Sequence, residues 1–202
     1  SEVDILLQHD LMPTVFSSIA INHISKAAKR LGKKGNVHLK VDTGMTRFGC
    51  HINEAVHLAE EIHKDTHLNL TGVYTQFSSA DNKESSYTQT QWDRFQECKS
   101  HIQGRGITVT SYHMANSAAT NNFQESHGDL VRIGLMAYED IVEFKSEVVM
   151  LRSVSAGTPV GYNEHYIPGS STTIASVFGG YADGIPMSLG KKGKVIINGE
   201  YY

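Results

Sequence analysis

The sequence predicts an α/β protein in which parallel strands and crossover helices form part of a (β/α)8-type TIM barrel, followed by a mainly β C-terminal region. Up to residue 138, apolar runs with the two-residue period of a strand alternate with stretches of helical period. Such alternation is typical of parallel strands joined by crossover helices, for which a barrel is the natural closed form. After residue 141, strand-like runs follow one another with turn residues between them and no helical stretch.

The elements of the barrel part are predicted from their periodicity and their end signals. Residues 4–7 have the apolar character of a sheet interior, and residues 15–18 that of a short strand. The apolar spacing over 21–31 fits one face of a helix that Gly32 ends. The elements expected next are a strand at 37–42, a helix capped by Asn53, a strand at 70–74, a helix over 87–102 ended by Gly104, a strand at 107–113, a short helix starting at 116–120 and a strand at 130–134.

The C-terminal part is predicted to contain strands at 144–154, 172–178 and 194–197, with turns at Ala156-Gly157 and Asn198-Gly199. We therefore expect two domains, an α/β barrel domain over residues 1–138 and the start of a β domain over residues 141–202. The junction at 138–141 has no linker composition, which agrees with a segment having been shortened or lost there.

Composition and charge exclude several classes of function. The 202 residues include 18 basic and 21 acidic side chains spread without long runs, so neither a nucleic-acid surface nor a membrane-binding patch is expected. The two cysteines and 11 histidines form no metal-binding pattern, and no metal is predicted. No signal peptide or membrane span is recognised, which favours a cytoplasmic protein. Since residue 1 is serine, we expect the chain to be part of a longer one.

Residues 37–49, Val-His-Leu-Lys-Val-Asp-Thr-Gly-Met-Thr-Arg-Phe-Gly, are the stretch around which the chain is organised. A strand of alternating apolar and polar residues runs directly into a cluster of polar residues and glycines. Lys40, Asp42 and Arg47 fall at the carboxyl end of this strand, where ligands bind in barrels and open sheets of parallel strands. The pattern favours a binding site over an ordinary strand followed by a solvated loop.

Five further stretches contain residues suited to chemistry. Ser117 starts a helix and could form a phosphate-binding site with the backbone N–H groups of Gly134 and Leu135. The alternative is that Ser117 only caps its helix, as a single serine commonly does. Arg132 lies within an apolar run and requires an acceptor, which an ion pair or a ligand would supply equally well. The five stretches are residues 74–81, 113–119, 131–134, 159–162 and 179–184.

Taken together, these stretches resemble the alanine racemases, which are pyridoxal-phosphate enzymes built from an α/β barrel and a C-terminal β domain. The resemblance is carried by H-L-K-V-D-T-G-M-x-R-x-G, A-N-S-A-A, V-R-x-G and G-Y-A-D-G in this order, and it covers nearly the whole chain. It implies interconversion of L- and D-alanine for peptidoglycan synthesis and a homodimer whose active site is shared between subunits. It also implies that the first barrel strands and the lysine that binds pyridoxal 5'-phosphate lie upstream.

The resemblance also assigns roles to residues that bind the cofactor and substrate. Lys40 matches a lysine that is often carbamylated and then holds Arg47, which contacts the phenolic oxygen of the cofactor and the substrate carboxylate. Ser117 and the backbone of Gly134 and Leu135 match phosphate contacts.

Four further matches concern the cofactor ring and the proton transfer. Arg132 matches the arginine that faces the pyridine nitrogen, and His113 matches a histidine that supports this arginine. An arginine does not give up its proton, so the pyridine nitrogen stays unprotonated. The cofactor ring then withdraws electrons less strongly than a protonated ring would. Tyr162 matches the catalytic tyrosine, which acts in the partner subunit's site, and Tyr181 matches a residue that narrows access for the substrate.

Two positions depart from the family pattern. Gln76 replaces the usual histidine of a T-H-F stretch, and Thr46 replaces a glycine or asparagine. No lysine here lies in the motif of the family's cofactor lysine. Two alternatives therefore stay open: a racemase of another small amino acid such as serine, or a pyridoxal-phosphate-binding protein without catalytic activity.

Overall fold

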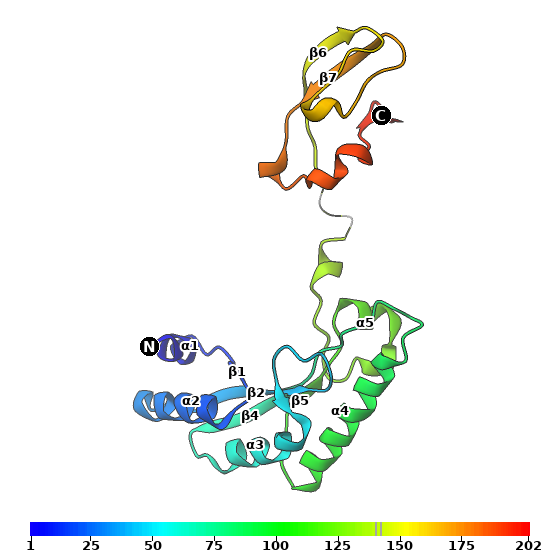
Figure 1. Ribbon diagram of the computed structural model, residues 1–202. Coiled ribbons are helices and arrows are strands. Elements are labelled where there is room, and N and C mark those ends of the chain that lie inside the picture. The colour runs from blue at the N-terminus through cyan, green and yellow to red at the C-terminus, as the bar shows by residue number, and fades with distance from the viewer. Residues whose placement is uncertain (140, 142) are drawn as a thin grey trace. The chain divides into compact units, whose positions relative to one another are not determined.

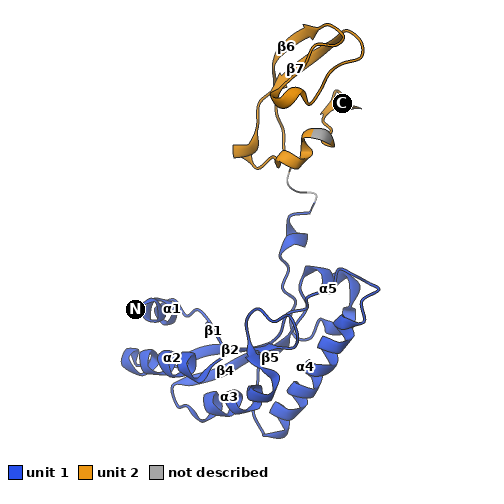
Figure 2. Ribbon diagram, viewed as in Figure 1, with its two compact units in different colours: residues 1–141 blue, residues 142–202 orange. Residues whose placement is uncertain are grey.

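The computed structural model describes residues 1–139, 141 and 143–202, except for the side chain of Lys191. The chain forms two compact units, Ser1–Ile141 and Val142–Tyr202 (Figure 2). Asp140, at the junction where the sequence led us to expect a shortened segment, lies outside the described residues.

The first unit is built on a sheet of five parallel strands (Figure 1). Its order is β1-β2-β4-β5, and β3 pairs with β2 beyond this path. The strands are β1 (Thr14–Val15), β2 (Gly35–Asp42), β3 (Cys50–His51), β4 (Leu68–Tyr74) and β5 (Ser111–His113). The predicted α/β class with parallel strands is confirmed.

The strands of this unit alternate with helices α1 (Glu2–Gln8), α2 (Ser18–Leu31), α3 (Ile52–Lys64), α4 (Tyr87–Gly104) and α5 (Ser117–Asn122). Helix α2 shows both of its end signals. The Ser17 side chain accepts a hydrogen bond from the N–H of Ala20, and Gly32 adopts φ 64°, a left-handed conformation that glycine tolerates without strain. The predicted end of this helix at Gly32 is therefore confirmed.

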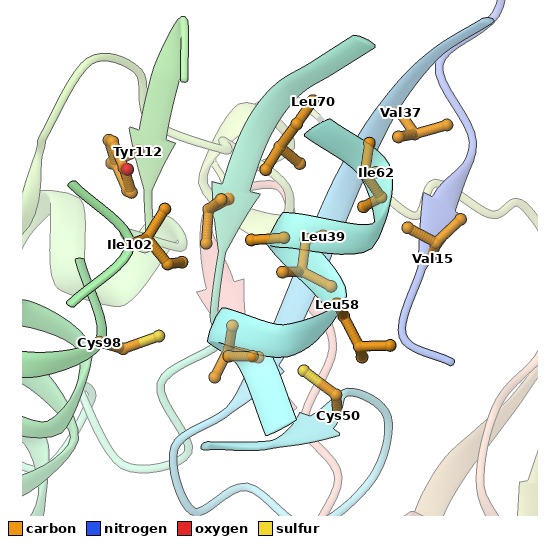
Figure 3. Close-up of a cluster of buried hydrophobic side chains, with 14 of the residues drawn as sticks. Val15, Val37, Leu39, Cys50, Leu58, Ile62, Leu70, Cys98, Ile102 and Tyr112 are labelled. Carbon is orange, nitrogen blue, oxygen red and sulfur yellow. The ribbon is translucent and has the colours of Figure 1, made fainter. Parts of the chain in front are cut away.

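The two-residue period of β2 separates the core from the site. Val37, Leu39 and Val41 are 0% exposed and belong to the hydrophobic core. Figure 3 shows Val37 and Leu39 beside Leu58 and Ile62 of α3. The residues between them, His38, Lys40 and Asp42, are half-buried. Successive side chains of a strand point to opposite faces, so these three lie on the face turned away from the core.

The prediction of a sheet interior at residues 4–7 is wrong, because these residues belong to helix α1. Ser1 and Asp4 form a capping box at its start, and Arg30 also hydrogen-bonds Asp4. Leu7 of this helix is buried and Val3 packs against the core, whereas Ile5 is 55% exposed, so the apolar run does not form part of a sheet interior.

The start of helix α3 and the segment at 130–134 also differ from the prediction. Strands β1 and β5, and the strands found within 144–154 and 194–197, are shorter than the strands predicted there. Helix α3 is capped by His51, whose Nδ1 accepts from the N–H of Asn53, and Asn53 itself lies inside the helix. The predicted strand at 130–134 is wrong, since this apolar segment forms no ladder. Its backbone bonds to the β5 region are isolated ones, such as that from Arg132 N to Ala115 O, and the 3₁₀ turn η2 (Leu135–Ala137) follows it.

The second unit is mainly β, as predicted. Strands β6 (Val148–Val154) and β7 (Thr172–Val177) are antiparallel, and so are β8 (Ile196–Ile197) and β9 (Glu200–Tyr201). Asn198 and Gly199 join β8 to β9 with φ angles of 54° and 87°, the left-handed pair typical of a two-residue hairpin turn. Short 3₁₀ turns η3 (Tyr162–Glu164), η4 (Tyr181–Asp183) and η5 (Met187–Lys191) complete this unit.

Candidate active site

A cavity of about 490 Å³ opens on the polar face of the sheet in the first unit. Its walls combine one residue of β1 with residues of β2, β4 and β5 and of the segments that follow β4 and β5. The lining residues are Thr14, His38, Lys40, Tyr74, Gln76, His113, Leu130 and Arg132. Most lie toward the carboxyl ends of parallel strands, where ligands bind in folds of this type.

The Arg132 guanidinium is held by acceptors from two neighbouring segments, residues 75–76 and residues 113–114. Its Nη1 lies 2.6 Å from Nδ1 of His113, and its Nη2 donates to Thr75 O at 2.8 Å, Gln76 Oε1 at 3.0 Å and Met114 O at 3.2 Å. All four acceptors are neutral. From the sequence, an ion pair and a ligand contact were equally acceptable partners for Arg132. No described carboxylate forms an ion pair with Arg132, so the ion-pair alternative finds no support among the described residues.

This arrangement leaves Arg132 with unused capacity to bind. A guanidinium has five N–H donors. Among the described residues, the Nε hydrogen and one Nη1 hydrogen have no acceptor. Burial lowers the pKa of Arg132 from its usual value, which reflects the cost of this charge away from water. A polar or anionic ligand in the cavity would supply the missing acceptors.

His113 is the most buried polar residue of the cavity, at 3% exposed. Burial, the Arg132 charge and the neighbouring His38 lower the pKa of His113 to about 3, so its imidazole is neutral at neutral pH. The ring of Tyr74 stacks on it with 4.8 Å between centroids and 7° between planes. The Tyr74 hydroxyl is in turn 2.9 Å from Oγ1 of Thr14.

Lys40 lies beside these groups without a carboxylate partner among the described residues. Its Nζ is 5.6 Å from the centre of the Tyr74 ring and 5.8 Å from that of the Phe48 ring. Burial and then the charges of Arg47 and Arg132 lower the pKa of Lys40. The site is therefore a cluster of cations, and Lys40 is the one most readily present as a neutral amine.

Asp42 stabilises the loop that follows β2 by accepting hydrogen bonds from its backbone. Its Oδ1 accepts from the N–H of Gly44 at 2.8 Å and from the N–H of Thr46 at 3.1 Å. These bonds shape the turn that carries Arg47, whose side chain is exposed. Thr46 adopts φ 56°, a left-handed conformation that strains a β-branched residue and suits glycine or asparagine better.

Ser117 and the turn after residue 133, for which the sequence predicts a phosphate cradle, lie within hydrogen-bond distance of each other. Ser117 Oγ accepts from the N–H of Gly134 at 2.9 Å and from that of Met136 at 3.4 Å. The alternative that Ser117 caps α5 is wrong, because the cap is Asn116, whose Oδ1 accepts from the N–H of Ala119 at 3.0 Å. Leu135, between the two donors, is 81% exposed.

Tyr162 and Tyr181 belong to the second unit, on η3 and η4, and their side chains are 94% and 69% exposed. The cavity of the first unit is built without them. His38, Tyr74 and Thr14 also line it. His38 and Tyr74 lie in stretches that the sequence indicated, although no role was predicted for either, and Thr14 lies in none of them. The sequence contained a signal for His38, because residues two apart on a strand share a face and His38 therefore lies on the same face as Lys40.

Within the described part of the chain, no group of three or more His, Cys, Asp or Glu side chains is placed to hold a metal ion. None of the helices described has the length and apolar character needed to cross a bilayer.

The fold and the cavity define a protein with a parallel α/β unit, a cationic pocket on the polar face of its strands, and a β unit after it. Residues 1–141 match the family model of the alanine racemase N-terminal domain, and residues 141–202 match that of the C-terminal domain. The chain belongs to the alanine racemase family.

Curated relatives agree over almost the entire chain. The alanine racemase of Halothermothrix orenii is 32% identical over 98% of this chain, and that of Carboxydothermus hydrogenoformans is 36% identical over 98%. The chain covers 56% and 58% of these two proteins, so it spans about half the length of the curated relatives it matches.

Solved structures show the same fold. Alanine racemase from a D-cycloserine-producing Streptomyces lavendulae matches with a TM-score of 0.91 and 28% identity, over 98% of this chain and 57% of that one. The Clostridium difficile 630 enzyme in complex with cycloserine matches with 0.81 and 26% identity, over 98% and 55%. The Bartonella henselae enzyme, which carries covalently bound pyridoxal phosphate, matches with 0.82 and 24% identity, over 98% and 57%.

Proposed function

We propose that this chain is the cofactor-binding and substrate-binding part of an alanine racemase, which interconverts L- and D-alanine with pyridoxal 5'-phosphate and supplies D-alanine for peptidoglycan. The observation that carries the proposal is Arg132. A guanidinium held by four neutral acceptors, with donor hydrogens left over beside a cavity, suits a neutral ring nitrogen that accepts without being protonated.

The residues present fit this cofactor at both of its ends. Arg132 would bind the pyridine nitrogen, and His113 would support Arg132 from behind. Ser117 Oγ and the N–H groups of Gly134 and Leu135 would bind the phosphate. The Gly134 N–H donates to Ser117 Oγ in this structure and would exchange that acceptor for a phosphate oxygen. When bound, pyridoxal phosphate withdraws electrons from the α-carbon of the amino acid and so acidifies its proton.

Lys40 and Arg47 would orient the substrate. The lowered pKa of Lys40 favours its neutral amine, which would combine with carbon dioxide and release a proton to solvent, giving a carbamate anion among cations. That anion would hold the Arg47 guanidinium in place. Arg47 would then bind the substrate carboxylate and the phenolic oxygen of the cofactor, a task that suits its planar pair of donors.

Tyr162 would move the proton. In the homodimer implied by the family, Tyr162 of one subunit acts in the site of the other and takes the α-proton of L-alanine at its phenolic oxygen. A tyrosine of ordinary pKa near 10 needs nearby cations for this, and the cluster of Lys40, Arg47 and Arg132 supplies them. The opposite face requires a second base, the family lysine for which this sequence has no matching motif. Tyr181 would restrict the site to small side chains.

The test is to incubate the purified gene product with pyridoxal phosphate and, separately, L-alanine or L-serine, and to separate the product enantiomers by chiral chromatography. We expect D-alanine to form much faster than D-serine. Faster formation of D-serine would favour the serine alternative, and cofactor binding without either product would identify a non-catalytic binding protein. Both outcomes would contradict the proposal.

A further inference from the structure

Two imidazoles meet on the polar face of the first unit. Nε2 of His113, on β5, lies 3.2 Å from Nδ1 of His38, on β2, and the ring centroids are 5.2 Å apart. Strand β4 lies between these two strands in the sheet. The His38 side chain therefore reaches across a whole strand to meet His113.

Gly72 of β4 makes this reach possible. It is the register partner of His38. A Cβ atom at position 72 would lie 2.6 Å from both Cε1 and Nδ1 of the His38 ring, closer than real Cβ atoms approach other atoms. The ring of His38 occupies the space that a side chain at position 72 would need, so the contact with His113 depends on glycine there.

The direction of the hydrogen bonds follows from Arg132. A guanidinium only donates, so Nδ1 of His113, 2.6 Å from Nη1, must present a lone pair. A neutral imidazole with a lone pair on Nδ1 carries its proton on Nε2, and this N–H then donates to Nδ1 of His38. The three residues form a chain in which Arg132 donates to His113 and His113 donates to His38.

We propose that His38 is a positioning residue of the cofactor pocket: by accepting from Nε2 of His113, it holds His113 in the tautomer that offers a lone pair to Arg132. The consequence for catalysis rests on the proposed function, whereas the tautomer itself does not.

The other tautomer of His113 would place an N–H against the Nη1 hydrogens of Arg132. The guanidinium would then lose its shortest contact and move relative to the group that it binds. The charged groups around the pair are the cations Arg132 and Lys40 and the carboxylate Asp129, which is hydrogen-bonded to the N–H of Tyr112. Arg132 favours the lone pair on Nδ1, and an acceptor at Nε2 favours the same tautomer from the other side of the ring. An acceptor at Nε2 also makes Nδ1 a stronger acceptor, because hydrogen bonds in a chain polarise one another.

The tautomers are measured directly by long-range ¹H–¹⁵N NMR of the ¹⁵N-labelled protein near pH 7. We expect Nδ1 of His113 and Nδ1 of His38 to give the shift of an unprotonated nitrogen, and both Nε2 atoms that of an N–H. A protonated Nδ1 on His113 would overturn the proposal, and this result needs no variant.

Variants test the dependence on His38. His38→Asn keeps an acceptor at the place of Nδ1, whereas His38→Leu removes it and Gly72→Ala displaces the ring. We expect His38→Leu and Gly72→Ala to mix the His113 tautomers and to weaken pyridoxal phosphate binding about three- to tenfold, the effect of one lost hydrogen bond. His38→Asn and the exposed control His23→Leu should stay near the wild type. Unchanged His113 shifts in His38→Leu would overturn the proposal. The predicted tautomers in a protein without racemase activity would support the role of His38 and contradict the proposed function alone.

Discussion

Nη2 of Arg132 donates to Oε1 of Gln76 across 3.0 Å, at the position where most of the family is expected to have histidine. The departure therefore preserves an acceptor for the arginine. It replaces a titratable ring by an amide that is neutral at every pH. The amide oxygen of Gln76 reaches the guanidinium of Arg132.

Removing this acceptor should destabilise the first unit. We expect Gln76→Leu to lower the free energy of unfolding by about 1.5–3 kcal/mol, the typical contribution of a hydrogen bond to a charged group. Gln76→His restores an acceptor and should recover most of the loss. Urea denaturation followed by fluorescence measures both, and equal stability of Gln76→Leu and the wild type would show that this bond contributes nothing.

The stability of the protein should decrease as the pH falls below about 6.5. The pKa of His113 is about 3 in the folded protein and near 6.5 when unfolded. At a pH between these two values, His113 binds a proton in the unfolded chain but not in the folded one. The free energy of unfolding should therefore fall with decreasing pH by up to about 1.4 kcal/mol per pH unit from this group. Measurements between pH 5 and 6.5 avoid the carboxylates Asp4 and Asp10, whose lowered pKa values keep them ionised there.

His113→Asn tests the origin of this slope. It keeps an acceptor toward Arg132 but cannot titrate, so the dependence on pH should become shallower. The matched change His23→Asn, at an exposed position of α2, should leave the slope as it is. Equal slopes in all three proteins would assign the pH dependence to other groups.

Lys40 should bind carbon dioxide. With ¹³C-labelled bicarbonate, we expect a carbamate resonance in the ¹³C NMR spectrum that disappears in Lys40→Arg. Lys64→Arg, at a side chain 75% exposed, should keep it. A resonance that survives Lys40→Arg would locate the carbamate elsewhere, and its absence from the wild type would leave Arg47 without the proposed anion.

Tyr162→Phe should lower the rate from L- to D-alanine by about 10²–10⁴-fold while pyridoxal phosphate stays bound, since the change removes the general base and no cofactor contact. Steady-state rates and the visible absorption of the cofactor separate the two effects. An unchanged rate would remove Tyr162 from the mechanism. Mixing Tyr162→Phe with Arg47→Ala should restore part of the activity if each site combines residues of two subunits.

The sequence predicted the elements whose signals are local. The alternation of Val37, Leu39 and Val41 fixed β2 and its two faces, and Gly32 fixed the end of α2. Residues 130–134 were predicted as a strand because they are apolar, but strand formation depends on a partner along the whole segment, and their backbone makes only isolated bonds.

The candidate site was predictable in kind but not in detail. The need of Arg132 for an acceptor followed from its apolar neighbours, whereas the acceptors themselves, such as Thr75 O and Met114 O, come from segments brought together by the fold. The sequence did not distinguish His38 from the other ten histidines, because its proposed role depends on Gly72, which is 34 residues away and lies in the neighbouring strand.

The most direct test of the racemase assignment is the exchange of the α-proton of alanine with solvent. The purified gene product, loaded with pyridoxal phosphate, is incubated with L-alanine in D₂O and followed by ¹H NMR and by optical rotation. We predict that the α-proton signal disappears and the rotation decays to zero, with deuterium in both enantiomers. A persistent α-proton signal and an unchanged rotation, with the cofactor bound, would contradict the account.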